Sequence, residues 1–369
     1  MKRLPTPSHL WPVLRNQWLG LAVLAGLVLF PVAYGLIAGG GAGSGPARYW
    51  QGQLIAVFIL AVYAMSYDLL MGYTGILSFG HAAFFGGGAY TISLWLAHAM
   101  PRIAGKSPGG AAEVGLFLLG VVLVVVVSAL LGLLFSTVSI RVKGVYFAMI
   151  TLAIAEAIFI LSKATDFVQW TGADEGLHGI PVPAWLNPTQ FRTRFYFIAL
   201  AFMALMYLTL HRIVNSPTGR VLVAIRENES RARMIGYNPA VYRTIAFVIS
   251  AVVAGLAGAF FSLWNLSATP SMTSVVTTIN ALIMTILGGI GTLIGPMLGA
   301  GLMQAFSQFF YQWFGARWPL VFGVVFILLV MFLPYGIVGA WQTRRYDLQA
   351  GWRRLFQPLR AQGEAEEKL

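Results

Sequence analysis

The stretch from Tyr67 to Tyr90 reads YDLLMGYTGILSFGHAAFFGGGAY, which is long and apolar enough to enter a membrane but is interrupted by glycines, hydroxyls and one histidine. Lipid offers no hydrogen-bond partner to the N–H and C=O groups that a break in a helix sets free. Such a break therefore survives at membrane depth only inside protein or beside a water-filled cavity. Broken helices in that setting hold the substrates of many transporters, so the stretch favours transport over catalysis.

The composition excludes a soluble domain built around one core, because 58% of the residues are hydrophobic, 10% are charged and the mean hydropathy is +0.76. The chain has no cysteine, which excludes disulfides, Cys-ligated zinc and iron–sulfur clusters. The net charge of +12 comes from basic residues in loops and tails between apolar runs. That placement indicates membrane orientation rather than nucleic-acid binding. We expect no metal site and no cofactor.

Apolar runs bounded by charged residues, Gly or Pro divide the chain, and most reach the roughly 20 residues that cross the hydrocarbon core. They predict an all-α, polytopic integral membrane protein with eight to ten transmembrane or re-entrant helices. One run, 278–290, is too short to cross alone, so we expect it to be tilted, re-entrant or fused with its neighbour. The runs are 18–38, 53–71, 76–99, 114–136, 144–162, 195–213, 244–264, 278–290, 293–314 and 318–340.

The first apolar run follows Lys2, Arg3 and Arg15, as a signal peptide would. Its length of about 20 residues is that of a full span rather than of the shorter apolar region of a signal peptide, so we expect an uncleaved helix. With residues 1–17 in the cytoplasm, 17 of the 24 basic residues also fall on that side, in 2–15, 141–143, 212–243 and 344–368. The positive-inside rule therefore predicts that both termini are cytoplasmic.

Polar side chains gather at the interruption of the 67–90 stretch. Tyr73 and Thr74 stand at the break, and Ser78 and His81 are three residues apart and share one helical face. A helix that begins here would add N–H groups and the positive end of its dipole. These groups are candidates for a substrate path that receives a carboxylate or an amide. The alternative is a tightly packed helix whose glycines serve helix–helix contact.

Two acidic residues lie in or beside apolar runs. Glu156 is near the middle of 144–162, where a carboxylate costs about 2.5–3.5 kcal/mol on insertion scales and needs an inward-facing partner. Either a buried hydrogen-bond network or a contact with the substrate path would meet that need. Asp68 stands at the end of an apolar run, and we expect it to be hydrated.

Gly288, Gly291, Gly295 and Gly299 are three, four and four residues apart, a spacing that predicts one helical stripe for close helix packing. Lining of a substrate path is the other interpretation. Pro296 within this stripe predicts a kink or a break. The spacing Gly-x-x-Gly-x-Leu at Gly72 recurs at Gly288, each time at an irregular point between two runs, which is weak support for duplicated halves.

The predicted cytoplasmic segment 215–243 has apolar residues near helical spacing and charged residues between them. Ser216-Pro217 before it and Gly236 to Pro239 after it are helix start and stop signals. A short helix capped at both ends suits docking to another protein, although a helix on the membrane surface has the same pattern. The candidate coupling residues are Leu222, Ile225, Glu229, Arg231, Ala232 and Gly236.

Several co-linear stretches resemble the permease subunits of branched-chain amino acid ABC importers, a family similar to the permeases for urea and short amides. The resemblance covers roughly residues 50–340. The stretches are GYTGILSFGHAAFFGGGAY from Gly72, GVYFAMITLAIAEAIF from Gly144, TGADEGLHGIP from Thr171, AIRENESRARMIGYN from Ala224, AFVISAVVAGLAGAF from Ala246 and GGIGTLIGPMLGA from Gly288.

The resemblance implies a permease domain over 18–340, with 215–243 as the loop that couples it to an ATPase and 341–369 as a cytoplasmic basic tail. Glu229, Ala232 and Gly236 match the family's coupling pattern, whereas Arg231 and Arg233 stand where small residues are usual. The implied partners are a second permease subunit, expected to be a paralogue, two cytoplasmic ATP-binding subunits and a periplasmic solute-binding protein. The implied location is the bacterial inner membrane.

The functional hypothesis is thus a permease without its own ATP site, for branched-chain amino acids or similar small polar solutes. Gly105-Lys106-Ser107 is not a phosphate-binding loop, because Met100 stands where that motif needs glycine. The alternative is an ion- or proton-coupled transporter that uses Glu156 and His81. A membrane enzyme is a third class, weakened by the lack of a catalytic cluster.

Overall fold

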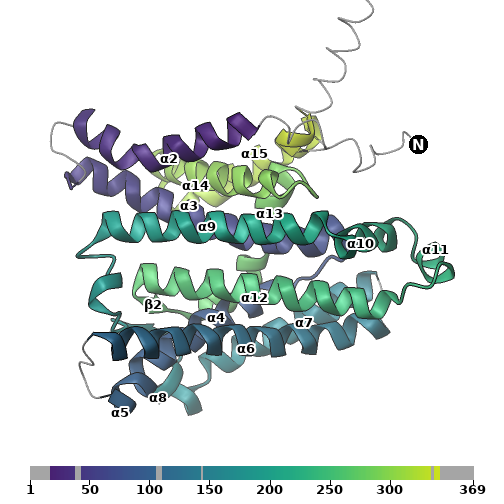
Figure 1. The fold of residues 1–369 in the computed structure, drawn as a ribbon, viewed down its shortest axis with the longest axis horizontal. Coiled ribbons are helices and arrows are strands. Elements are labelled where there is room, and N and C mark those ends of the chain that lie inside the picture. Colours follow the sequence, from purple (N-terminus) through teal and green to yellow (C-terminus); the bar gives the residue numbers. More distant parts are fainter. Residues whose placement is uncertain (1–16, 38–42, 105–109, 143, 334–335, 341–369) are drawn as a thin grey trace, which may run out of the picture.

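A computed structural model describes residues 17–37, 43–104, 110–142, 144–333 and 336–340 of the chain. Nearly all of the predicted cytoplasmic N-terminus, the tripeptide 105–107 and the predicted basic tail 341–369 lie outside the described residues. Figure 1 shows long helices that run side by side along the longest axis of the molecule.

The described part of the chain is a helical protein, which confirms the predicted fold class. Helices account for most of the described residues in each predicted apolar run. The only strands among the described residues are two short antiparallel ones, β1 (Leu177–His178) and β2 (Ser267–Ala268). The long helices are α2 (Gln17–Ile37), α3 (Gly45–Asp68), α6 (Ala111–Arg141), α7 (Val145–Lys163), α9 (Arg192–Asn215), α12 (Pro239–Asn265), α14 (Ile294–Phe314) and α15 (Trp318–Phe332).

Six described segments are long and apolar enough to cross a membrane, and the apolar helices Ala22–Leu36 and Val275–Gly288 are shorter. The predicted total of eight to ten spans and the side of each terminus stay predictions. The six segments are Gly45–Thr74, Ala111–Ser139, Val145–Lys163, Arg192–Asn215, Pro239–Asn265 and the run Ile294–Ala340, which holds α14 and α15.

The predicted interruption of the 67–90 stretch is confirmed, but it lies after Tyr73 and Thr74 rather than at them. Ser78 falls outside the helix that His81 begins, so the two residues do not share a helical face as predicted. After α3 the chain passes into a π-helix, η2 (Leu69–Thr74), which ends at Gly75 in the left-handed conformation with φ 72°. Residues 75–80 are not helical, and α4 (His81–Leu94) then continues through η3 (Trp95–Ala99) into α5 (Met100–Ala104). Single π-turns of this kind are frequent at functional sites.

A second break separates α13 (Val275–Gly288) from α14. At 1.5 Å per residue, the 14 residues of α13 span about 21 Å, which is less than the roughly 30 Å of the hydrocarbon core. The chain turns through Gly289 and Gly291, which have φ values of 122° and 76°. It then packs α14 back along α13 as an antiparallel hairpin.

The four glycines from Gly288 to Gly299 therefore do not share one helical stripe, as their spacing predicted. Gly288 ends α13, Gly291 lies in the turn, and Gly295 and Gly299 belong to α14. A Cβ on Gly288 would collide with the carbonyl of Gly295, and one on Gly299 with the carbonyl of Met284. These positions are still places of close backbone approach, but between two helices joined by a turn.

The core lies where α12 packs against α3, α4 and α6. Small residues bring the backbones together, because a Cβ on Gly88 of α4 would strike the backbone of Gly255 in α12. Ser93 of α4 and Ser262 of α12 add a buried hydrogen bond of 2.6 Å between their hydroxyls.

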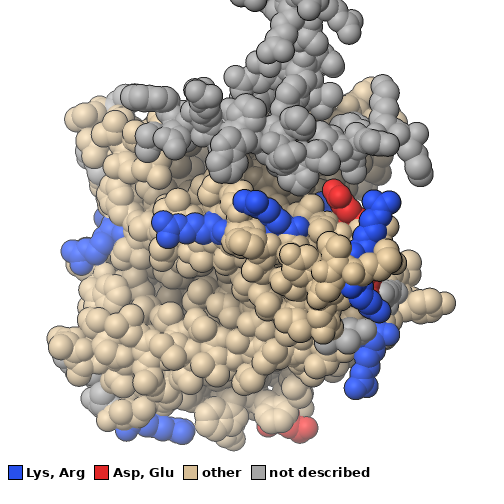
Figure 2. Space-filling model, turned by 45° about the vertical axis from the view of Figure 1, so that its right-hand side comes forward, with Lys and Arg blue, Asp and Glu red and all other residues tan. Residues whose placement is uncertain are grey.

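The two ends of the bundle differ. Helices α10 (Pro217–Glu227) and α11 (Glu229–Met234) extend beyond one end, at the right of Figure 1, whereas α5, α8 (Val168–Thr171) and β2 lie toward the other. In Figure 2, which brings the right-hand side of Figure 1 forward, several Lys and Arg side chains line the right-hand edge.

Candidate functional site

In the non-helical part of the first break (residues 75–80) and at the start of α4, side-chain hydroxyls accept hydrogen bonds from backbone N–H groups. The N–H of Phe79 donates to Thr151 Oγ1 at 3.2 Å, that of Gly80 to Ser78 Oγ at 3.2 Å, and that of Ala82 to Thr278 Oγ1 at 2.8 Å. Thr151 belongs to α7 and Thr278 to the first turn of α13. The break is thus joined to two other helices by uncharged groups.

His81 begins α4 inside an aromatic enclosure. Its ring contacts Tyr63, Tyr67 and Phe84, and the residue is 0% exposed. Its Nε2 lies 2.9 Å from Ser66 Oγ. Because the Ser66 hydroxyl already donates its proton to the Tyr63 carbonyl, Nε2 acts as the donor in this contact. Nε2 accepts only if the Ser66 hydroxyl turns away from Tyr63. The Nδ1 atom has no hydrogen-bond partner among the described residues.

The other candidates for the substrate path near this break are also buried. Tyr73 and Thr74 lie in η2, and the Thr74 hydroxyl donates to the Leu70 carbonyl at 2.5 Å. The Tyr67 hydroxyl donates to the Ser78 carbonyl at 3.2 Å. In the described conformation these residues join the break to the core, so contact with a solute requires the break to open.

Glu156 lies apart from this cluster. It is half-buried on α7, a helix whose buried face is formed by Phe147, Ala148, Thr151 and Ala155. Within the described part of the chain it has no ion pair and no hydrogen-bonded side-chain partner. The partner that a mid-span carboxylate needs is therefore not supplied by the described residues, including His81.

Asp68 is not hydrated, contrary to the expectation from its place at the end of an apolar run. It is 0% exposed, and its two carboxylate oxygens accept hydrogen bonds from the backbone of the second break. Oδ1 accepts from the Gly291 N–H at 2.7 Å, and Oδ2 accepts from the Leu293 N–H at 3.2 Å. One side chain at the start of the first break thus holds the turn that forms the second.

The two breaks also touch directly. A Cβ on Gly72 would lie 2.6 Å from the Gly291 nitrogen, so no larger residue fits at Gly72 without movement of the backbone. The recurring Gly-x-x-Gly-x-Leu spacing therefore marks two segments that lie against each other. The sequence repeat signalled the resemblance of the segments but not their contact.

Arg226 of α10 reaches into this contact. Its Nη1 donates to the Gly72 carbonyl, and its aliphatic stem lies beside Gly75. Its positive charge also attracts the Asp68 carboxylate. Sequence reasoning missed both Asp68 and Arg226, because the charge of each was assigned to a hydrated surface.

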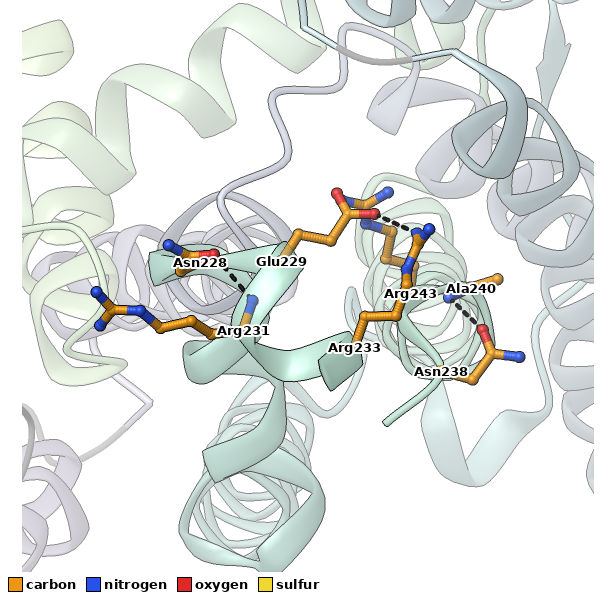
Figure 3. Close-up of polar contacts among 7 residues, drawn as sticks. All are labelled: Asn228, Glu229, Arg231, Arg233, Asn238, Ala240 and Arg243. Atoms are coloured by element: carbon orange, nitrogen blue, oxygen red, sulfur yellow. Dashed lines mark hydrogen bonds and ion pairs between the residues drawn. The ribbon is translucent and has the colours of Figure 1, made fainter. Parts of the chain in front are cut away.

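The 215–243 segment forms two capped helices rather than the single helix that its pattern predicted. Ser216 caps α10, with its Oγ accepting from the Gly219 N–H, which confirms the predicted start signal. Asn228 interrupts the segment and caps α11, and Asn238 caps α12. The Glu229 carboxylate joins Arg233 at 2.9 Å and Arg243 of α12 at 2.8 Å (Figure 3). These contacts fix the segment to the bundle.

The apolar side of this segment faces inward, which corrects the expectation that it forms an exposed docking surface. Leu222, Ile225 and Ala232 are only 1%, 4% and 2% exposed, and Ile225 and Ala232 pack with Tyr242 of α12. The most exposed large apolar side chains of the segment are Met234 and Ile235, at 78% and 71%. They lie next to Gly236, which leaves α11 with φ 93°, and Arg231 is exposed nearby.

Facing helix breaks inside a bundle of apolar helices define a multi-pass membrane protein of the kind that moves solutes. The chain belongs to the family of permease components of branched-chain amino acid transport systems, whose model matches residues 51–333. The family match confirms the resemblance seen in the sequence.

The relatives are permease proteins LivM of branched-chain amino acid transport systems. The high-affinity system protein of Salmonella typhimurium is 26% identical over 304 residues, which cover 76% of this chain and 68% of the relative. The probable permease of Methanocaldococcus jannaschii is 24% identical over 309 residues, which cover 80% of this chain and 86% of the relative. No solved structure matches the chain significantly.

Proposed function

We propose that this chain forms part of the translocation path of an ABC importer for branched-chain amino acids or similar small polar solutes. It works in the bacterial inner membrane with a second, paralogous permease, two ATP-binding subunits and a periplasmic solute-binding protein. Membership of the permease family over residues 51–333 is the observation that carries this proposal. The chain acts as a transport subunit, and the hydrolysis of ATP falls to its partners.

The α10–α11 segment is the proposed docking site of an ATP-binding subunit. Its capped helices and the Glu229–Arg243 ion pair hold it firmly against α12, as a surface that transmits force requires. Met234 and Ile235 supply an exposed apolar contact, and Arg231 supplies charge beside it. Leu222, Ile225 and Ala232 support this surface from within.

Four buried residues of the first break, Tyr73, Thr74, Ser78 and His81, are proposed to line the path when the break opens. Glu156 is proposed to meet its polar partner outside the described residues. The proton-coupled alternative draws no support from the geometry, since no hydrogen bond joins Glu156 to His81 among the described residues.

Transport assays separate the two functions. The chain is reconstituted in vesicles with its cognate permease partner, ATP-binding subunits and solute-binding protein, and uptake of labelled leucine, urea and a short amide is measured. We expect leucine uptake that requires ATP hydrolysis and continues when the proton gradient is collapsed. Uptake driven by a proton gradient without ATP would establish the alternative instead.

The docking surface is tested by Ile235→Asp, which places a charge on the exposed apolar contact without entering the core. We expect the variant to reach the membrane at normal levels but to lose co-purification with the ATP-binding subunit. Arg220→Ala, at an exposed position of α10 away from this contact, is the control that removes a charge, and it should still co-purify. Normal assembly and uptake by Ile235→Asp would show that the segment is only a membrane-surface helix.

A further inference from the structure

The contact among Asp68, Arg226 and the two breaks joins three segments that are far apart in the sequence. Asp68 ends α3, Arg226 lies near the end of α10, and Gly291 and Leu293 form the turn between α13 and α14. The carboxylate accepts two N–H groups of that turn, and the guanidinium donates to the Gly72 carbonyl of η2. A displacement of α10 therefore acts on both breaks through hydrogen bonds rather than through loose packing.

The backbone at this contact has little freedom to absorb such a displacement. Gly72 touches the Gly291 backbone, and Leu293 is held at φ 53°, a left-handed conformation that a leucine rarely adopts. The Leu293 N–H is one of the two groups that Asp68 holds. Release of the carboxylate would leave that conformation without its hydrogen bond.

We infer that Arg226 and Asp68 form a transmission link, in which Arg226 carries movement of α10 to the first break and Asp68 carries it on to the second. The inference rests on the proposed function, because α10 moves only if an ATP-binding subunit docks beside it. Both residues act as positioning residues, since they hold backbone groups and are not proposed to touch the solute.

The link lies between α10, in the proposed docking segment, and the backbone of the two breaks. A contact that passes force from one segment to another must hold while both segments move, and a hydrogen bond from a charged guanidinium is about twice as strong as a neutral one. Arg226 is also the exposed member of this contact, on the helix that a docked subunit is proposed to move. The neutral hydroxyl contacts of the first break have no such exposed member.

The test measures solute transported per ATP hydrolysed by the complete complex in vesicles. Arg226→Gln removes the charge and the fork of donors. Arg220→Gln is the matched control, since Arg220 is exposed on the same helix and its side chain forms no hydrogen bond or ion pair with another described residue. We expect Arg226→Gln to assemble and hydrolyse ATP but to lower the ratio by about tenfold, within the about 5–150-fold range of coupling interactions. Arg220→Gln should keep the wild-type ratio.

An unchanged ratio in Arg226→Gln would overturn the inference, and so would an equal fall in Arg220→Gln. If Arg226→Gln does not accumulate, Arg226→Lys keeps the charge and is measured instead, with an intermediate ratio expected. Failure of both variants to form the complex would make the contact a folding requirement and would also overturn the inference. Failure of the proposed function is distinct, because the wild-type complex would then show no ATP-driven uptake.

Discussion

The break before α4 and the turn between α13 and α14 share a glycine pattern and lie against each other, yet different chemistry holds them. Hydroxyls of Ser78, Thr151 and Thr278 satisfy the N–H groups of the first. A single carboxylate, Asp68, accepts two N–H groups of the second. Each device meets the requirement that no backbone group stays unpaired where water is excluded.

The difference lies in what each device connects. The hydroxyls join the first break to helices inside the bundle, and each can be replaced at the loss of one neutral hydrogen bond. Arg226 of α10 donates to the Gly72 carbonyl. Gly72 lies against the Gly291 backbone that Asp68 holds, so the charged contacts connect both breaks to the end of the molecule where α10 and α11 lie. The comparison indicates that the neutral hydrogen bonds fix the shape of the breaks, whereas the charged hydrogen bonds pass the movement of α10 to them.

The largest effect is expected from Asp68→Ala. The substitution leaves the N–H groups of Gly291 and Leu293 unpaired, at about 1–3 kcal/mol each. We expect a marked fall in the apparent melting temperature of the purified protein in detergent. Asp174→Ala is the control, because Asp174 is a largely exposed acid paired with Lys163 and such pairs contribute about 0–1 kcal/mol. Equal melting temperatures for the two variants would remove the distinction between the breaks.

A smaller effect is expected from Thr278→Val, which keeps the shape of the side chain. It removes an interaction with the Tyr63 hydroxyl, which also donates to the Thr277 carbonyl, and leaves one buried group unpaired, the Ala82 N–H. The cost should be about 1–3 kcal/mol for that one group, less than for Asp68→Ala. In the same melting experiment, Thr209→Val serves as the control, since the Thr209 hydroxyl is exposed and bonds only within its own helix. A loss larger than that of Asp68→Ala would reverse the proposed order of the two devices.

The smallest effect is expected from Glu156→Gln, which lies at neither break. Glutamine keeps the ability to form hydrogen bonds and removes the charge, so uptake should persist across pH with only a modest change. Uptake of labelled solute by the assembled complex at several pH values is the measurement. Complete loss of transport in a complex that still hydrolyses ATP would place Glu156 on the substrate path instead.

The hydrophobic pattern predicted much of this architecture, because apolar runs of membrane length leave few alternatives to a helix. An interruption within 67–90, a helix start at Ser216 and a helix end before Gly236 were also predictable, because Gly, Pro and small polar residues act locally. The exact place of the interruption and the cap at Asn238 were not predicted. Family membership followed from the co-linear stretches.

Contacts between distant segments were not predictable in this way. The burial of Asp68 depends on a turn more than 200 residues later, and no local pattern signals it. The inward side of α10 was misassigned because helical spacing shows that Ile225 shares an apolar face but not which neighbour covers that face. Tyr242, in the next long helix, is that neighbour.

The most direct test of the link from α10 to the breaks is a distance measurement between spin labels, which the absence of native cysteine makes clean. One pair joins Arg220→Cys on α10 to Ile290→Cys in the second break, and a second pair joins Ile290→Cys to Leu130→Cys on the exposed side of α6; all three positions are exposed. In the assembled importer, ATP binding should leave the 220–290 distance unchanged and shift the 130–290 distance, because α10 and the turn move together. A 220–290 distance that changes with nucleotide, or a 130–290 distance that stays fixed, would contradict the link.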